Sequence, residues 1–251
     1  MVTMIDGKSV LGVVGGLGPM ASAEFLKTIY EHSLADLEQE SPTVIMYSDP
    51  TFPDRTEAFL SGNSDPVLAQ LIDVMERLLE AGATDVVFCC MTIHYLLPRL
   101  PARLRERVIS LPDIIFEHVG HARKRHLLIS SSGTRKLALF ENHPQWSSAE
   151  PFFVLPDEDD QNRIHKNLIY PMKTNPDLST QFPLLELLLE KYEVDSFIAG
   201  CSEIHMLAKH FLASGNRSSK YSAIDPLAIL AHDWAQTGMN PRISEPVAAL
   251  A

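Results

Sequence analysis

The chain has 251 residues, of which 45% are hydrophobic, and a formal net charge of −11 at pH 7. This length and composition predict a globular protein with one large core or two smaller ones. The acidic balance argues against nucleic acid and anionic membranes as partners, because both are bound largely through lysine and arginine.

The chain contains three cysteines. An odd number cannot all pair internally, and the adjacent Cys89 and Cys90 are poorly placed to bridge each other, so we expect a reducing compartment. An apolar run from Val10 to the sequence Ala21-Ser22-Ala23 imitates a signal peptide, but its many glycines argue against that interpretation. No apolar stretch reaches the length of a membrane span. We therefore expect a cytoplasmic protein.

Apolar strand-like runs alternate with helical segments along the chain. Predicted strands cover residues 10–14, 43–47, 86–90, 127–130, 152–155 and 197–199. Predicted helices cover residues 21–34, 66–81, 161–170, 184–192 and 226–235. This alternation is typical of α/β proteins in which helices flank parallel sheets.

The two halves of the chain resemble each other. LLEAGATDVVFCC (residues 78–90) and LLEKYEVDSFIAGC (residues 188–201) both contain a helix end, an aspartate, an apolar strand and a terminal cysteine. VLGVVGG (residues 10–16) has a similar counterpart in LLISSSGT (residues 127–134). An internal duplication would produce two similar lobes, each with a thiol at the carboxyl edge of its sheet, where open α/β folds place their chemistry.

A glycine-rich turn follows the first predicted strand. Gly16-x-Gly18-x-x-Ala21 matches the dinucleotide-binding fingerprint, whose glycines let the backbone approach a pyrophosphate. The acidic residue that should follow is missing at the expected distance, since Asp49 lies too far along the chain. No Walker lysine follows the turn either. A site for a carboxylate fits these glycines equally well.

Three kinds of chemistry are compatible with the cysteines. Cys90-x-x-x-His94 is echoed by Cys201-x-x-x-His205, a ligand set that zinc accepts, although four residues at the starts of two helices are an unusual zinc site. Cys90 alone could be an acyl-transfer nucleophile with a histidine base, which leaves Cys201 unexplained. Two thiols on opposite faces of one carbon could instead act as base and acid and invert a stereocentre without a cofactor.

Five motifs together resemble the aspartate/glutamate racemase superfamily, and its aspartate racemase branch most closely. They are GGLGPMAS near the start, FPDRT at 52–56, the C-x-T-x-H run at 90–94, GCSEI at 200–204 and IDP at 224–226. The resemblance implies a pseudo-twofold, two-lobed α/β protein with its active site in the cleft between the lobes. It also implies a cofactor-independent, metal-free enzyme, commonly dimeric, that uses one cysteine from each lobe. Here that pair would be Cys90 and Cys201.

The resemblance also implies a substrate-binding set. Arg55 of FPDRT and Lys173 of IYPMK would bind the side-chain carboxylate of the substrate. Gly15 and Gly16 would border the pocket. Further roles fall to residues beside the two cysteines: Thr92 and Ser202 would reach the α-carboxylate or the amino group, and His94 and Glu203 would cap a helix or orient their neighbours.

One position departs from the family pattern. The family run reads Cys-Asn-Thr, whereas this chain has Met91 where the asparagine belongs. Methionine neither donates nor accepts a strong hydrogen bond, so Met91 would change substrate recognition, or would simply fill a gap in the core. Cys89 should face the other side of the sheet from Cys90 and belong to the core.

We therefore predict a racemase of an acidic amino acid, with aspartate as the first candidate and glutamate as the second. Residues 1–111 plus 226–251 would form one lobe and residues 112–225 the other. The expected partners are a small acidic substrate and a second copy of the chain. Two alternatives are open. The first is another reaction of the superfamily, of the maleate isomerase or hydantoin racemase type. The second is a non-catalytic binding protein for small acids, which Met91 would favour.

Overall fold

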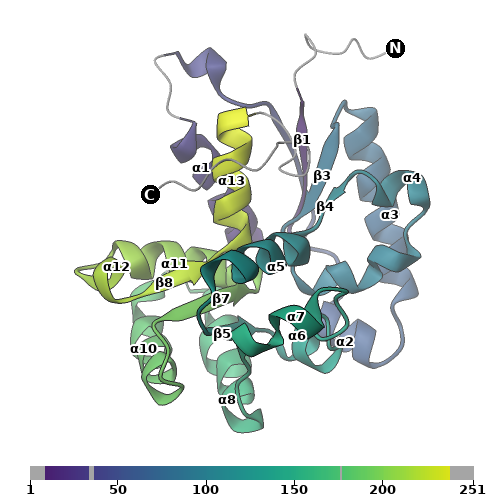
Figure 1. Cartoon of the computed structure of the whole chain (residues 1–251). Coiled ribbons are helices and arrows are strands. Elements are labelled where there is room, and N and C mark those ends of the chain that lie inside the picture. Colours follow the sequence, from purple (N-terminus) through teal and green to yellow (C-terminus); the bar gives the residue numbers. More distant parts are fainter. Residues whose placement is uncertain (1–8, 34–36, 176, 238–251) are drawn as a thin grey trace.

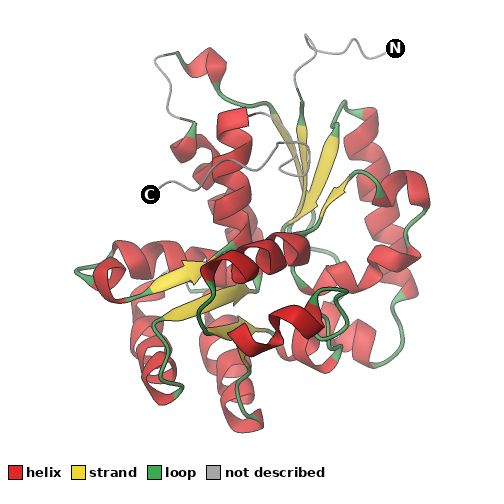
Figure 2. Cartoon of the chain, in the orientation of Figure 1, coloured by secondary structure: helices red, strands yellow, loops and turns green. Residues whose placement is uncertain are grey.

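The computed structural model describes residues 9–33, 37–175 and 177–237. Two groups of strands stand apart from each other, with helices around both (Figure 2). Each group is a parallel sheet of four strands. The first sheet has the order β2-β1-β3-β4 and the second has the order β6-β5-β7-β8. The topology is thus the same in both halves, as the internal similarity of the sequence predicts.

All six predicted strands are present, with ends shifted by one or two residues. The strands of the described residues are β1 (Leu11–Gly15), β2 (Val44–Ser48), β3 (Asp85–Phe88), β4 (Val108–Ile109), β5 (His126–Ser130), β6 (Phe153–Val154), β7 (Ser196–Gly200) and β8 (Ser222–Ile224). The sequence analysis missed β4 and β8. β6 is equally short, but Phe152 and Leu155 extend its apolar run to four residues, whereas β4 and β8 have only two and three residues to signal a strand.

Helices separate the strands in both halves (Figure 1). The α-helices are α1 (Pro19–His32), α2 (Arg55–Leu60), α3 (Asp65–Glu80), α4 (Ala102–Arg105), α5 (Leu111–Ala122), α6 (Ser132–Lys136), α7 (Trp146–Ala149), α8 (Glu158–Arg163), α9 (Tyr170–Met172), α10 (Phe182–Lys191), α11 (Ser202–Ala213), α12 (Arg217–Lys220) and α13 (Pro226–Thr237). Four 3₁₀ turns are η1 (Glu38–Glu40), η2 (Thr92–Arg99), η3 (Glu150–Phe152) and η5 (Leu178–Gln181), and one π-helical turn is η4 (Ile164–Ile169).

One predicted helix is divided. The segment 161–170 was expected to be a single helix, but the chain forms α8, then the π-helical turn η4, then the short helix α9. Apolar spacing identifies a helical segment but does not distinguish a 3.6-residue turn from a wider one. Leu34, the predicted end of the first helix, lies outside the described residues.

Three hydrophobic clusters form the interior. One covers the face of the first sheet that packs against α3 and includes Val14, Val86 and Phe88. A second covers the face of the second sheet that packs against α10 and α11. The third contains residues of both sheets, such as Val87 and Ile198, together with residues of α1, α5 and α13. The two halves therefore share one core between them.

Helix α13 returns to the first half of the chain and packs against α1 and α5 (Figure 1). Of its contacts, α1 belongs to the first proposed lobe, whereas nearly all of α5 and the whole of α11 belong to the second, so the division into residues 1–111 plus 226–251 and residues 112–225 stays a prediction. Residues 1–8 and 238–251 of the first proposed lobe lie outside the described residues. None of the described helices combines the length and the apolar character that a membrane span requires.

Candidate active site

A cavity lies where the central strands of both sheets end. The empty volume of the cavity is about 350 Å³, including the part that is open to solvent. Its lining residues are Leu17, Asp54, Arg55, Thr56, Cys90, Thr92, Ser131, His165, Ile169, Tyr170, Lys173, Cys201 and Glu203. Leu17, Cys90, Ser131 and Cys201 follow the carboxyl ends of β1, β3, β5 and β7. The duplicated halves thus contribute matching strand ends to one site.

Cys90 reaches this cavity because the side-chain alternation of β3 continues beyond the strand. Val87, Cys89 and Met91 belong to the core shared by both sheets, whereas Phe88 and Cys90 lie on the other side. Cys90 is 6% exposed. Cys89 is fully buried, and burial raises the pKa of its thiol far above the ordinary range. The expected separation of the two thiols, with Cys89 in the core, is confirmed.

His94 secures the turn that carries Cys90. Its Nε2 accepts a hydrogen bond from the backbone N–H of Leu111 at 3.2 Å. Nδ1 must then carry the ring proton, which it shares between the carbonyl oxygens of Cys90 (3.0 Å) and Met91 (3.1 Å). His94 is buried and does not line the cavity. It ties the backbone at Cys90 to the start of α5.

Cys201 occupies the position immediately before α11, between that helix and β7. Its Sγ donates a hydrogen bond to Oε2 of Glu203 at 2.8 Å. Burial raises the pKa of the Cys201 thiol well above its ordinary value, and the charge of Glu203 raises it further. Cys201 is therefore held in the protonated form, as a thiol.

Glu203 is buried, with 3% of its surface exposed, and it lines the cavity. Its Oε1 has no hydrogen-bond partner among the described residues. A Cβ atom added at Gly18 would lie 2.7 Å from that oxygen, so a glycine at this position leaves room for the carboxylate. Ser202 is also buried and donates to Glu203 Oε2 at 3.3 Å, but it does not line the cavity.

Three hydroxyl groups meet at one wall of the cavity. Thr92 Oγ1 lies 3.1 Å from Ser131 Oγ and 2.9 Å from Thr134 Oγ1. Ser131 and Thr134 follow β5, so this cluster joins the two halves of the molecule. Ser131 also caps α6 by accepting from the Thr134 N–H. Hydroxyls can both donate and accept, which suits them to a carboxylate or an ammonium group.

The lining also contains two cationic side chains. Arg55 donates from Nη2 to the Leu17 carbonyl at 2.5 Å and from Nη1 to the Pro53 carbonyl at 3.0 Å, and its Nε is buried without a partner among the described residues. Lys173 Nζ lies 4.7 Å from the centroid of the Tyr170 ring. The two cations come from different halves of the chain, as expected from their positions after the second strand and after the divided helix.

Gly15 and Gly16 lie beside the cavity lining, not in it. Gly16 has φ of +84°, and a Cβ there would come within 2.3 Å of the Asp49 backbone. A Cβ at Gly15 would lie 3.1 Å from that of Ser22, whose hydroxyl accepts from the Gly16 N–H at 3.1 Å. These glycines therefore serve the close packing of the turn, and this packing places Leu17 in the cavity wall.

Met91 also lies outside the lining. It is 2% exposed and packs in the core shared by both sheets. This is the position of a gap-filling core methionine, one of the two interpretations of the sequence.

The zinc alternative finds no support in the described part of the chain. No group of three or more histidine, cysteine, aspartate or glutamate side chains there is arranged to hold a metal ion. Both ring nitrogens of His94 are engaged within the Cys90 turn and with Leu111. His205 is engaged on both nitrogens as well, with Asp225 and Thr28.

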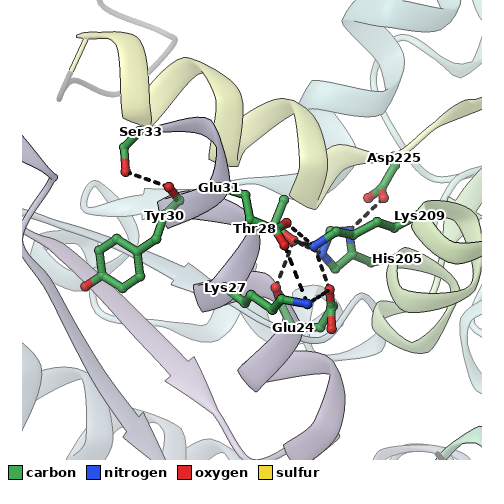
Figure 3. Close-up of polar contacts among 9 residues, drawn as sticks. All are labelled: Glu24, Lys27, Thr28, Tyr30, Glu31, Ser33, His205, Lys209 and Asp225. Carbon is green, nitrogen blue, oxygen red and sulfur yellow. Dashed lines mark hydrogen bonds and ion pairs between the residues drawn. The ribbon is translucent and has the colours of Figure 1, made fainter. Parts of the chain in front are cut away.

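A buried polar network holds α11, the helix that follows Cys201, against α1 (Figure 3). Thr28 Oγ1 lies 2.8 Å from the Glu24 carbonyl oxygen and 3.1 Å from His205 Nε2. His205 Nδ1 lies 2.7 Å from Asp225 Oδ2. His205 thus links Asp225 to Thr28 of α1 through its two ring nitrogens. Lys209 of the same helix binds Glu24 and Glu31.

The sequence analysis missed several lining residues: Leu17, Asp54, Thr56, Ser131, His165, Ile169 and Tyr170. Ser131 could have been found, since SSSGT is the counterpart of the glycine turn. Asp54 and Thr56 flank Arg55 in FPDRT. No feature of the sequence marks His165 and Ile169 as cavity residues, because their orientation depends on the π-helical turn η4.

Comparison with known proteins agrees with this geometry. An aspartate racemase from Picrophilus torridus has a similar structure, with a TM-score of 0.75 and 20% identity over 91% of this chain and 94% of that one. A glutamate racemase from Campylobacter jejuni subsp. jejuni reaches a TM-score of 0.57 at 17% identity, over 90% and 85% of the two chains. An allantoin racemase from Klebsiella pneumoniae reaches 0.55 at 12% identity, over 97% and 96%. At these identities the likeness establishes the fold.

The family itself follows from the sequence match. The pattern of the Asp/Glu/hydantoin racemases matches residues 14–233, which include both cavity cysteines and nearly all described elements. The chain therefore belongs to the Asp/Glu/hydantoin racemase family, and the protein is an isomerase.

Proposed function

We propose that this protein racemises a short acidic amino acid, aspartate in the first place, by proton transfer between Cys90 and Cys201. The observation that carries the proposal is that these two thiols, one from each sheet, line the same small cavity. A carbon atom between them has one sulfur on each face. Glutamate, one methylene longer, is the alternative acidic substrate.

In the proposed reaction, the thiolate of one cysteine removes the α-proton and becomes a thiol. The other cysteine, initially a thiol, delivers its proton to the opposite face of the α-carbon and becomes a thiolate. The carbon is inverted, and the enzyme ends with its two protonation states exchanged. Because the hydrogen bond to Glu203 keeps the proton on Cys201, we assign Cys201 as the acid and Cys90 as the base in the resting enzyme.

Charge complementarity supports an acidic substrate. Arg55 and Lys173 would bind the distal carboxylate, with the unpartnered Nε of Arg55 as a directional donor. Thr92 and Ser131 would bind the α-carboxylate, whose developing enolate-like charge needs hydrogen-bond donors. Glu203 has an unpartnered oxygen at the cavity and would accept from the substrate ammonium.

Incubation of the purified protein with L-aspartate in deuterated water tests the proposal. We expect loss of the α-proton signal by NMR and formation of D-aspartate by chiral chromatography, without an added cofactor. A binding protein would retain the α-proton. Absence of exchange with both aspartate and glutamate would refute the proposed reaction.

We further propose that the enzyme is a cytoplasmic homodimer. The three free cysteines suit a reducing compartment. Tyr30 on α1 and Tyr47 on the edge strand β2 are 40% and 37% exposed, which suits a surface that a second copy covers. Light scattering of the purified protein would give its mass, and a monomer at micromolar concentration would contradict the dimer.

A further inference from the structure

The π-helical turn η4 stands directly at the cavity. Such turns are rare, lie mostly within α-helices and are frequent at functional sites. Here the turn covers Ile164–Ile169, and the cavity is lined by His165 and Ile169 within it and by Tyr170 and Lys173 beyond it. His165 and Tyr170 are five residues apart, one π turn, and their ring centroids are 4.8 Å apart in an edge-on arrangement.

The proton position on His165 follows from its hydrogen bond. Its Nδ1 lies 3.3 Å from the backbone nitrogen of Ser132, which has a hydrogen to donate. In the neutral ring Nδ1 is then the acceptor and Nε2 carries the proton. The ring is thus fixed by one nitrogen and retains one N–H donor on the other.

The surroundings favour this neutral form. Burial lowers the pKa of His165, and the positive charge of Lys173 lowers it further, with smaller effects from Lys166 and Lys136; Asp54 opposes them. A neutral imidazole beside Lys173 avoids a further cation in a confined space, yet it still offers a directional donor.

We propose that the Nε2–H of His165 is a third donor to the distal carboxylate of the substrate, beside Arg55 and Lys173. This inference rests on the proposed function. The guanidinium and the ammonium supply charge. His165 supplies a hydrogen bond of fixed direction, held by Ser132 on one side and by Tyr170 on the other. A side chain that is held rigidly in this way selects a carboxylate by its position as well as by its charge.

Three substitutions separate recognition from a structural role. His165→Gln retains a donor near the place of Nε2 and loses the acceptor for Ser132. His165→Asn retains that acceptor and loses the donor. His165→Leu loses both. The neighbouring Asn167→Ala is a matched control, since Asn167 is an exposed residue of the same turn and does not line the cavity. Thermal unfolding of each variant checks that it folds.

If His165 binds the distal carboxylate, His165→Asn and His165→Leu raise KM for aspartate about tenfold or more, whereas His165→Gln and Asn167→Ala stay within a few-fold of the wild type. Unchanged KM in His165→Leu would overturn the proposal. Rescue by His165→Asn but not by His165→Gln would also overturn it, because His165 would then act through Ser132.

Succinate distinguishes this inference from the proposed reaction, because it offers carboxylates and has no stereocentre to invert. Its Kd, measured by calorimetry, should rise in His165→Leu and His165→Asn and not in His165→Gln, even if the wild-type enzyme exchanges no α-proton. If all four variants bound succinate with the affinity of the wild type, or if the wild type did not bind succinate, the proposal that His165 binds a carboxylate would be wrong.

Discussion

The Sγ atom of Cys201 lies 2.8 Å from Oε2 of Glu203, and this contact distinguishes Cys201 from Cys90. Both cysteines follow the third strand of their sheet, but we find a carboxylate only beside Cys201 among the hydrogen bonds of the described residues. The duplicated fold thus places two equivalent thiols in unequal electrostatic surroundings. In the proposed reaction one thiol is charged and the other protonated, and this inequality favours the proton on Cys201.

Replacement of the cysteines tests the two-thiol reaction. Cys90→Ala and Cys201→Ala should each reduce aspartate racemisation at least about 100-fold, because loss of either acid or base interrupts the proton transfer in both directions. Cys89→Ala is the matched control, since Cys89 is a buried core residue that should affect stability more than turnover. A well-folded Cys90→Ala or Cys201→Ala variant with wild-type turnover would exclude the mechanism.

Glu203→Gln should lower the pKa of Cys201. The negative charge of Glu203 and its hydrogen bond both favour the thiol, so removal of the charge makes the thiolate easier to form. Alkylation of Cys201 by iodoacetamide, followed by mass spectrometry against pH in a Cys90→Ala background, should begin at lower pH in the variant. An unchanged pH profile would show that burial alone sets the reactivity of Cys201.

Arg55→Lys should impair aspartate turnover although the charge is retained. A lysine has no planar fork and cannot hold the Leu17 and Pro53 carbonyls while it presents a directional donor to the substrate. We expect kcat/KM for aspartate to fall about tenfold or more in Arg55→Lys and in Lys173→Met, with much smaller losses for asparagine or alanine. Equal losses on charged and neutral substrates would assign both residues a structural role.

Met91→Asn should destabilise the protein and should not raise its activity. The family resemblance suggests that an asparagine at this position would improve substrate recognition, but Met91 packs in the core shared by both sheets. Burial of an unpaired amide there costs about 1–3 kcal/mol in the free energy of unfolding. Met91→Leu is the control and should cost less than about 1.5 kcal/mol. Urea denaturation compares the two, and a stable, more active asparagine variant would return Met91 to substrate binding.

Asp225→Asn should weaken both stability and turnover. It removes the carboxylate that binds the buried His205, and His205 lies one helical turn after Cys201 in α11. Loss of a hydrogen bond to a charged group costs about 1.5–3 kcal/mol in the free energy of unfolding. Asp233→Asn, in an exposed pair with His232, should cost under about 1 kcal/mol. Similar unfolding midpoints for the two variants would show that the buried network does not hold α11 in place.

The sequence alone determined six of the described strands and their alternation with helices. Apolar runs and helical spacing are local properties, so they predicted six strands, the duplicated topology and a cysteine at the end of the third strand in each half. The alternation of side chains along a strand also sufficed to separate Cys89 from Cys90. The motifs around Arg55 and Lys173 led to two cations that line the cavity.

The tertiary structure decided which side chains meet. The hydrogen bond from Cys201 to Glu203, the hydroxyl cluster of Thr92 with Ser131, and the orientation of His165 depend on packing between segments distant in the chain. Met91 is another residue whose place could not be predicted from the local sequence. Its neighbours in the sequence suggested a pocket residue, but it packs in the core shared by both sheets. Local patterns specify an element and its faces, whereas the partner of each face is set by the packing of the whole chain.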